Sequence, residues 1–290
     1  MHLFMKFKQN SFKIPFFLII FTAFLWSCAS SKAEITPSSI TEAAFIPDEF
    51  LWQPVSKGIE RFDFKNPELP VIYHAVKIDL TDQSLELICF PNEDTKTNGT
   101  GQFTGTRTSA FAKKNDCLVA VNASPFEGRF VTKKIVGIHS FNENDFSPAL
   151  SNYAAICFSN NTEGYEARIV SDQAQAYDKP FDYAFGGFFT VLKDDQVLDS
   201  FEKRYDSRCG AGISKDGKTL YLLVVEGEYP KKSRGLSYPQ CGMIFKAMGC
   251  SDALELDGGG SSQLCINGKS VLSYTAFRIQ ANSFGFTRKE

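Results

Sequence analysis

The chain alternates apolar and polar residues over many short stretches, a pattern typical of β-strands. Two of these stretches, VIYHAVKIDL and SLELICF, flank the polar turn 81–83 and predict a pair of neighbouring strands. The stretch GISKDGKTLYLLVVEGE predicts a hairpin that turns at Asp216-Gly217, and its second strand is apolar throughout, which favours a central position in a sheet. Further strands are predicted for CLVAVNA, YAAICF, YEARIV and AFGGFFTVL, and a second hairpin with an Asn-Gly turn for 262–274.

Helical periodicity is confined to two stretches. TRTSAFAKKND predicts a short helix, and a longer one begins after Ser237, a typical N-cap residue with Gln240 completing a capping box. Its expected features are Pro239 in the first turn, an apolar stripe of Met243, Ile244, Ala247 and Met248, and a stop at Gly249. Because apolar strands precede and follow this helix, we expect a strand-helix-strand crossover. The fold class predicted is α+β, a single domain with a mixed, strand-rich β-sheet flanked by a few helices.

The N-terminal residues have the pattern of an export signal. Lysines at 6, 8 and 13 precede IPFFLIIFTAFLW, an apolar run too short to span a bilayer with margin. The run ends at Ser27-Cys28, which resembles a bacterial lipoprotein signal in which Cys28 is lipidated; an uncleaved anchor helix is the alternative. Both predict an exported, membrane-anchored protein, periplasmic or on the cell surface. We expect a signal peptide at 1–27, a flexible polar tether at 28–48 and a domain at 49–290.

Composition limits the partners and cofactors. The net charge of -2 offers no basic surface for nucleic acid. No C-x-x-C motif occurs, and His74 and His139 are the histidines beyond the signal, so we predict no metal and no cofactor. Three of the seven cysteines after Cys28 lie in apolar runs and are expected to be buried thiols, namely Cys89, Cys117 and Cys157. Export makes some pairing conceivable among the others, Cys209, Cys241, Cys250 and Cys265.

The stretch ALELDGGGSSQL concentrates the chemistry. In a strand, Leu254 and Leu256 share one face, and Glu255 and Asp257 share the other. The glycines Gly258, Gly259 and Gly260 allow a tight turn that a ligand can approach closely. Successive free N–H groups in such a turn form an anion-binding nest, to which the hydroxyls of Ser261 and Ser262 add donors. An acid beside an anion site predicts general acid/base chemistry next to a phosphate or carboxylate. A triple glycine in isolation would more often be an ordinary packed turn.

The surroundings of this turn resemble the phosphodiester glycosidase family. The resemblance is carried by SRCGAGISKDGKTLYLLVVEGE, GLSYPQCGMIFKAMGCSDALELDGGGSSQLCING, LVAVNASPF, GGFF and FRIQANSFGF, and covers most of 50–288. It implies hydrolysis of a sugar-1-phosphodiester linkage at the cell envelope, with a glycan or sugar phosphodiester as substrate and no nucleic acid partner. The alternative is a non-catalytic surface lipoprotein that binds glycan or envelope polymer in the same cleft.

The resemblance also implies site residues. Asp257 and Glu226 stand at strand ends and are expected to act as the two catalytic carboxylates. The expected substrate-binding residues are Asn122, Arg208, Gly258, Gly259, Gly260, Ser261, Ser262 and Arg278. Three of them have structural alternatives, since Asn122 suits a turn, Arg208 a surface ion pair and Arg278 an ordinary two-faced strand.

The chain departs from the family pattern at three places. Glu228 stands where an arginine is usual, 123–126 read ASPF instead of GGFF, and Glu255 takes a position that is commonly Asn. Glu228 is expected to be a solvated rim residue and His139 a structural histidine. The missing cation at Glu228 favours the binding-protein alternative.

Overall fold

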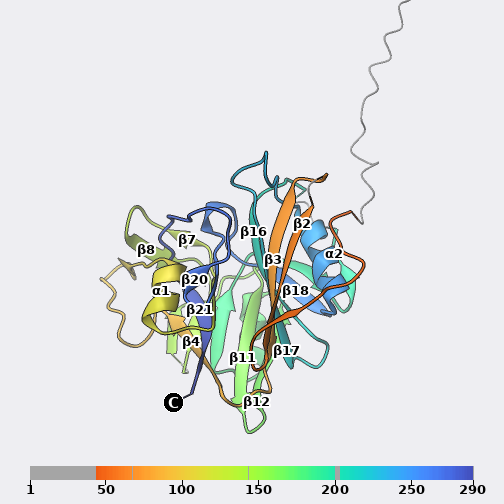
Figure 1. Cartoon of the computed structure of the whole chain (residues 1–290). Helices are drawn as coiled ribbons and strands as arrows, with labels where there is room; N and C mark the ends of the chain where they lie inside the picture. Colours follow the sequence, from red (N-terminus) through yellow and green to blue (C-terminus); the bar gives the residue numbers. More distant parts are fainter. Residues whose placement is uncertain (1–43, 67, 143, 200–202, 290) are drawn as a thin grey trace, which may run out of the picture. The chain divides into compact units, whose positions relative to one another are not determined.

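An eight-stranded sheet forms the centre of the molecule, and every neighbouring pair in it is antiparallel (Figure 1). The computed structural model describes residues 44–66, 68–142, 144–199 and 203–289. In spatial order the strands are β1 (Gln53–Ser56), β2 (Ile59–Asn66), β3 (Val71–Asp79), β17 (Thr219–Val225), β16 (Arg208–Ile213), β18 (Asp252–Glu255), β14 (Thr190–Lys193) and β15 (Gln196–Val197).

Strand β17 is central, as its apolar sequence predicts, and is buried on both faces. Its residues alternate between two cores, with Leu222 and Val224 on one side and Leu223 and Val225 on the other. The predicted hairpin joins β16 to β17, and Gly217 in its turn has φ +69°. Because β17 and β18 both run antiparallel to β16, they are parallel to each other with β16 between them. The crossover is therefore present, with one strand inserted.

Helix α2 (Tyr238–Met248) makes that crossover and covers one face of the sheet (Figure 1). The Ser237 N–H donates to Gln240 Oε1 at 2.9 Å, and Gly249 ends the helix at φ +99°, so both predicted caps are confirmed. The predicted apolar stripe is partly wrong. Ala247 is exposed, and Phe245 is fully buried because the missing side chains of Gly210 and Gly212 let its ring lie against β16.

Three smaller antiparallel sheets complete the fold. One contains β10 (Asn144–Ser147), β9 (His139–Phe141), β13 (Tyr183–Gly186), β11 (Ala155–Asn161) and β12 (Gly164–Val170). A second contains β20 (Lys269–Ser270), β19 (Leu264–Ile266), β6 (Val119–Asn122), β21 (Ser283–Arg288) and β4 (Leu85–Phe90). The third contains β5 (Phe103–Thr104), β8 (Thr132–Ile135) and β7 (Phe126–Glu127). Within the described residues, the remaining helical segments are α1 (Thr108–Lys114), η2 (Gln173–Asp178) and η3 (Gly259–Ser261).

The main core lies between the large sheet and the two five-stranded sheets. Successive side chains of β6 point to opposite faces of its sheet. Val119 and Val121 pack in the main core, while Ala120 packs in a smaller core that contains Phe111 of α1. The predicted α+β class, rich in strands and with few helices, is confirmed, and the strands are divided among four sheets.

One predicted pairing is wrong. The strands expected on either side of the turn 81–83 exist as β3 and β4, but they do not pair with each other. Strand β3 lies between β2 and β17, and β4 pairs with β21. A short polar turn is compatible with a hairpin, but partners distant in sequence decide which sheet each strand joins.

The described residues belong to one compact unit, Thr41–Glu290. Phe45 already packs in the core under α2, four residues before the expected domain start at 49. Cys28, the signal and most of the tether lie outside the described residues. No helix in the described part of the chain has the length and apolar content needed to cross a bilayer. All seven described cysteines are buried and free, which confirms the buried thiols expected at Cys89, Cys117 and Cys157.

Candidate active site

The glycine-rich turn follows β18 and is held at both ends by one side chain from another sheet. Asn122, at the end of β6, is buried; its Nδ2 donates to the Asp257 carbonyl at 2.7 Å, and its Oδ1 accepts from the Gln263 N–H at 2.8 Å. The Asp257 N–H donates to the Ala123 carbonyl at 2.7 Å. Asn122 thus positions the turn, and both of its amide atoms are occupied in doing so.

The glycines meet two different requirements. Gly259 has φ +57°, in the left-handed region that other L-residues rarely adopt. At Gly260 a Cβ would lie 3.1 Å from a guanidinium nitrogen of Arg278, so its absence gives that side chain room. The predicted nest of successive free N–H groups is not formed, because three of these groups already have acceptors. The Gly259 N–H donates to the Ser207 carbonyl, just before β16, and the N–H groups of Ser261 and Ser262 donate to the Gly258 and Gly259 carbonyls within the turn. Among the described residues, the N–H groups of Gly258 and Gly260 have no acceptor.

A cavity of about 310 Å³ opens beside the turn, on the face of the sheet that α2 covers. Its walls combine two arginines, two aspartates and three aromatic rings with the first glycines of the turn. They are Phe188, Phe189, Arg204, Asp206, Arg208, Tyr238, Asp257, Gly258 and Gly259. A concave site with aromatic walls and a few convergent polar groups is typical of small-ligand sites.

Arg208 begins β16 and is buried in the wall of this cavity. Its Nε donates to the Leu236 carbonyl at 2.7 Å, its Nη2 donates to the Arg204 carbonyl, and its guanidinium lies 4.5 Å from the centre of the Tyr238 ring. The cation is therefore fixed in orientation. A guanidinium has five N–H donors, so donors remain for an anionic ligand.

Asp257 and Glu255 point to the same side, as predicted, and burial raises the pKa of both. The pKa of Asp257 rises to about 6 through burial, which Ser261 and the charge of Arg278 partly offset. That of Glu255 rises to about 7 through burial, opposed by Arg208 and the Cys241 thiol. Neither oxygen of Glu255 has a hydrogen-bond partner of normal geometry among the described residues. Desolvation is the main cause of both raised pKa values.

Arg278 approaches the turn from the segment before β21. It is exposed, and its Nη1 donates to Ser261 Oγ at 3.3 Å. Ser261 is fully buried, and its carbonyl accepts from Gln280 Nε2 at 2.9 Å. The Ser262 hydroxyl is buried and has no hydrogen-bond partner within the described part of the chain. Arg278 and Ser261 thus interact with Asp257. Neither of them lines the cavity, and Gly260 and Ser262 do not line it either.

Glu226 belongs to a separate hydrogen-bonded group. Its carboxylate accepts from the Ser273 N–H at 2.6 Å and Ser273 Oγ at 2.5 Å, and lies 3.0 Å from His74 Nε2. The other ring nitrogen of His74 lies 2.6 Å from Asp63. Burial opposes ionisation of Glu226, but the bonds from His74 and Ser273 outweigh it and lower its pKa. For His74, burial is likewise outweighed by its two carboxylate partners, which raise its pKa.

The structure does not place Glu226 beside Asp257. By strand alternation Glu226 shares the face of Val224, whereas Arg208 and Asp257 are on the face that α2 covers. Strand β16 also separates β17 from β18. The predicted crossover therefore connects two strands whose ends are one strand apart, and it does not bring Glu226 to Asp257. Glu228 is exposed at the rim, as expected, and accepts from Ser207 Oγ at 3.2 Å.

Several residues that line the cavity are not among the site residues predicted from the sequence. Phe188 and Phe189 lie within the GGFF stretch that the resemblance included, and Tyr238 opens the predicted helix. Arg204 and Asp206 stand in a stretch without recognisable pattern. Among the described residues, no three His, Cys, Asp or Glu side chains gather closely enough to hold a metal ion.

Comparison with known proteins identifies relatives of this fold. Residues 115–287, more than half of the chain, match the family model described as phosphodiester glycosidase. No curated protein sequence matches significantly. The catalytic domain of zebrafish N-acetylglucosamine-1-phosphodiester alpha-N-acetylglucosaminidase, auto-inhibited by its pro-peptide, superposes with a TM-score of 0.61 at 17% identity, covering 82% of this chain and 85% of that one.

Two further solved structures have the same fold. A hypothetical protein from Synechocystis gives a TM-score of 0.64 at 14% identity, covering 84% of this chain and 64% of its own length. This chain therefore spans slightly less than two thirds of that protein. A protein from Burkholderia pseudomallei described as exported gives a TM-score of 0.61 at 12% identity, covering 74% of each chain.

Substitution of Gly259 tests the left-handed turn. A Cβ there would meet only Asp206 Oδ1, at 3.9 Å, so the cost of a side chain comes from the backbone. Gly259→Val should lower the free energy of unfolding by about 1–3 kcal/mol. Gly259→Asn should cost less, because Asn tolerates this conformation. Urea unfolding measures both; Gly99→Val, at an open site without a positive φ, is the control. Equal stability of the Val and Asn variants would contradict the strain argument.

The His74 group predicts a pH-dependent stability. The raised pKa of His74 stabilises the fold below its unfolded pKa, and this contribution is lost as pH rises through the folded pKa. The lowered pKa of Glu226 contributes above its own unfolded pKa. His74→Gln should therefore destabilise most between about pH 4.3 and 6.5 and less at pH 9. Urea unfolding at pH 5.5 and 9 checks this, and a difference independent of pH would refute it.

Proposed function

This chain belongs to the phosphodiester glycosidase family, and from that membership and the geometry around Asp257 we propose that it hydrolyses the glycosidic bond of a sugar-1-phosphodiester. The observation that carries the proposal is a half-buried carboxyl with a pKa of about 6 in a cavity that also contains a fixed arginine. A carboxyl with such a pKa can accept or donate a proton near neutral pH.

The charges around the turn suit a phosphodiester. We assign phosphate binding to Arg208, with its remaining guanidinium donors, and to Arg278, which reaches Ser261 from the other side of the turn. The free N–H of Gly258 adds a neutral donor at the cavity wall. The rings of Phe188, Phe189 and Tyr238 offer apolar surface to a sugar. A phosphate leaving group needs little protonation, so electrostatic stabilisation by these donors contributes much of the rate.

For Glu226 the hydrogen bonds favour a positioning role. Its carboxylate is saturated by His74 and Ser273, and it orders the segment 273–278 that ends in Arg278. Asn122 acts in the same way on the turn itself. The catalytic pair expected from the sequence is thereby reduced to Asp257, with Glu226 supporting the arginine-bearing segment.

Three substitutions separate these roles. Asp257→Asn should lower kcat by about 10²-fold or more, because it removes the proton-transferring group. Glu255→Gln should cost much less, since Glu255 does not line the cavity. Glu226→Gln should lower thermal stability and raise KM more than it lowers kcat. The assay uses purified protein and a sugar-1-phosphate diester.

The pH profile provides an independent check of Asp257. The kcat/KM profile should show a limb near pH 6 that is absent from any residual activity of Asp257→Asn. Saturable binding of the diester without turnover in the wild-type protein would instead identify a binding protein. A near-normal kcat for Asp257→Asn would remove this carboxyl from the mechanism.

We further propose that the protein is exported and anchored by a lipid on Cys28. Support comes from the lysines, the short apolar run and the Ser27-Cys28 boundary of the N-terminal sequence. Cys28→Ala should move the protein from the membrane fraction or block its processing, while the folded domain stays intact. Ser27→Ala, which keeps a small residue before the cysteine, is the matched control. An unchanged membrane fraction with an intact N-terminus in Cys28→Ala would indicate an anchor helix instead.

A further inference from the structure

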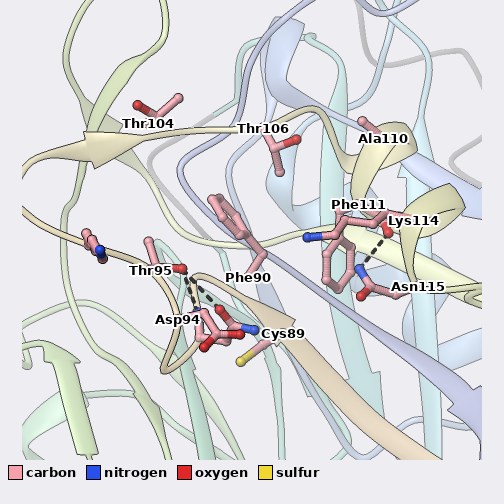
Figure 2. A pocket seen from close by; sticks show the side chains of 12 residues that line it. Cys89, Phe90, Asp94, Thr95, Thr104, Thr106, Ala110, Phe111, Lys114 and Asn115 are labelled. Atoms are coloured by element: carbon pink, nitrogen blue, oxygen red, sulfur yellow. Dashed lines mark hydrogen bonds between the residues drawn. The ribbon is translucent and has the colours of Figure 1, made fainter.

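A second cavity, larger than the one beside Asp257, lies elsewhere in the molecule. It has a volume of about 710 Å³ and lies between the segment that follows β4, strand β5 and helix α1 (Figure 2). It shares no lining residue with the Asp257 cavity. Its volume is within the range of sites that hold a drug-sized ligand.

The centre of this cavity is an aromatic ring held in place by its neighbours. Phe90 is half-buried and packs edge-on against Phe103, with ring centres 6.0 Å apart. In the view of Figure 2, Thr95 lies on one side of the Phe90 ring and Phe111 and Asn115 on the other. A fixed aromatic ring provides the apolar surface on which the C–H face of a pyranose packs.

Two amide side chains are held beside that ring by their own hydrogen bonds. Thr95 Oγ1 accepts from the Asn92 N–H and donates to Asn92 Oδ1, each at 3.1 Å. Asn115 Nδ2 donates to the Phe111 carbonyl at 2.8 Å. Asn92 Nδ2 and Asn115 Oδ1 then have no partner in the described chain, so a fixed donor and a fixed acceptor remain for sugar hydroxyls.

The charges of the lining select an anionic ligand. Lys96 and Lys114 are exposed at the cavity, and neither forms an ion pair with any described residue. Asp94 is the one acidic side chain in the lining. Lysine acts as a point charge toward phosphate or carboxylate. The side chains that line the cavity therefore carry a net charge of +1, beside groups suited to a sugar.

The cavity is connected to the catalytic turn by a short chain of bonds. The backbone of Thr106, which lines the cavity, exchanges two hydrogen bonds with Gln280, at 3.1 and 2.8 Å. Gln280 in turn donates to the Ser261 carbonyl, and Arg278 lies two residues earlier. One chain segment therefore separates the cavity from the turn.

We propose that this cavity is a second carbohydrate site, which binds a sugar unit bearing a phosphate or carboxylate group. Phe90 packs against the ring of the sugar, the amides of Asn92 and Asn115 bind its hydroxyls, and Lys96 and Lys114 bind the anionic group. The site binds without requiring turnover, so its test is independent of the proposed hydrolysis.

The test is site-resolved binding to purified full-length protein. Glucose 6-phosphate and glucuronate are titrated separately, and the side-chain amide NMR signals of Asn92 and Asn115 are followed. Both ligands should shift these signals, and neutral glucose should bind at least about tenfold more weakly. A response to one anionic sugar alone identifies phosphate or carboxylate as the group bound and still supports the site. Inorganic phosphate that binds as tightly as glucose 6-phosphate would overturn the sugar assignment.

Matched variants locate the charge contribution. Lys96→Ala combined with Lys114→Ala should weaken binding about tenfold, as expected for two partly exposed charge contacts. Lys113→Ala combined with Lys231→Ala removes the same charge from exposed lysines outside the cavity and should leave the affinity unchanged. Unmoved Asn92 and Asn115 signals at high ligand concentration, or equal affinity of the two double variants, would overturn the proposal.

Discussion

The two hydrogen bonds of the Asn122 amide join the glycine-rich turn to a second sheet, and the geometry of the candidate site depends on them. They connect the end of β6 with the start and end of the segment 257–263, which would otherwise be an unsupported glycine-rich turn after a short strand. A side chain that donates to one carbonyl and accepts from one N–H fixes both position and orientation. Arg278, Gly260 and Ser261 can then meet at defined distances, because these bonds hold the turn against the end of β6.

Burial acts differently on the three carboxylates near the strand ends. Glu226 receives hydrogen bonds from a histidine and a serine, and its charged form is retained. Asp257 and Glu255 receive fewer, and burial raises the pKa of each toward neutrality. Hydrogen bonds thus lower the pKa of the carboxyl on one face of the sheet, whereas desolvation raises the pKa of the two carboxyls on the other face. The difference in pKa between Glu226 and the other two carboxyls follows from the face of the sheet on which each side chain lies.

The segment 273–281 links the two cavities to the sheet. Ser273 is bound by Glu226, Arg278 reaches Ser261, and Gln280 pairs with Thr106 at the second cavity. The residue that Glu226 binds, Ser273, and the arginine that reaches the turn, Arg278, therefore belong to one segment.

The sequence by itself determined the local elements and the position of the turn. Apolar alternation, the Asp216-Gly217 and Asn267-Gly268 turns, and the Ser237 to Gly249 caps are local signals, and the corresponding elements are present. The positive φ of Gly259 also follows from a local requirement, namely that of a tight turn for a residue without a side chain. The tertiary structure decided which strands are neighbours. Strand β16 lies between β17 and β18, so Glu226 and Asp257 lie apart, and β3 and β4 join different sheets. The tertiary structure also decided that most N–H groups of the turn donate to backbone carbonyls. It likewise decided that Phe188, Phe189 and Arg204 line the cavity. The reason is that strand pairing and burial are set by contacts between residues far apart in the chain, which no local pattern records.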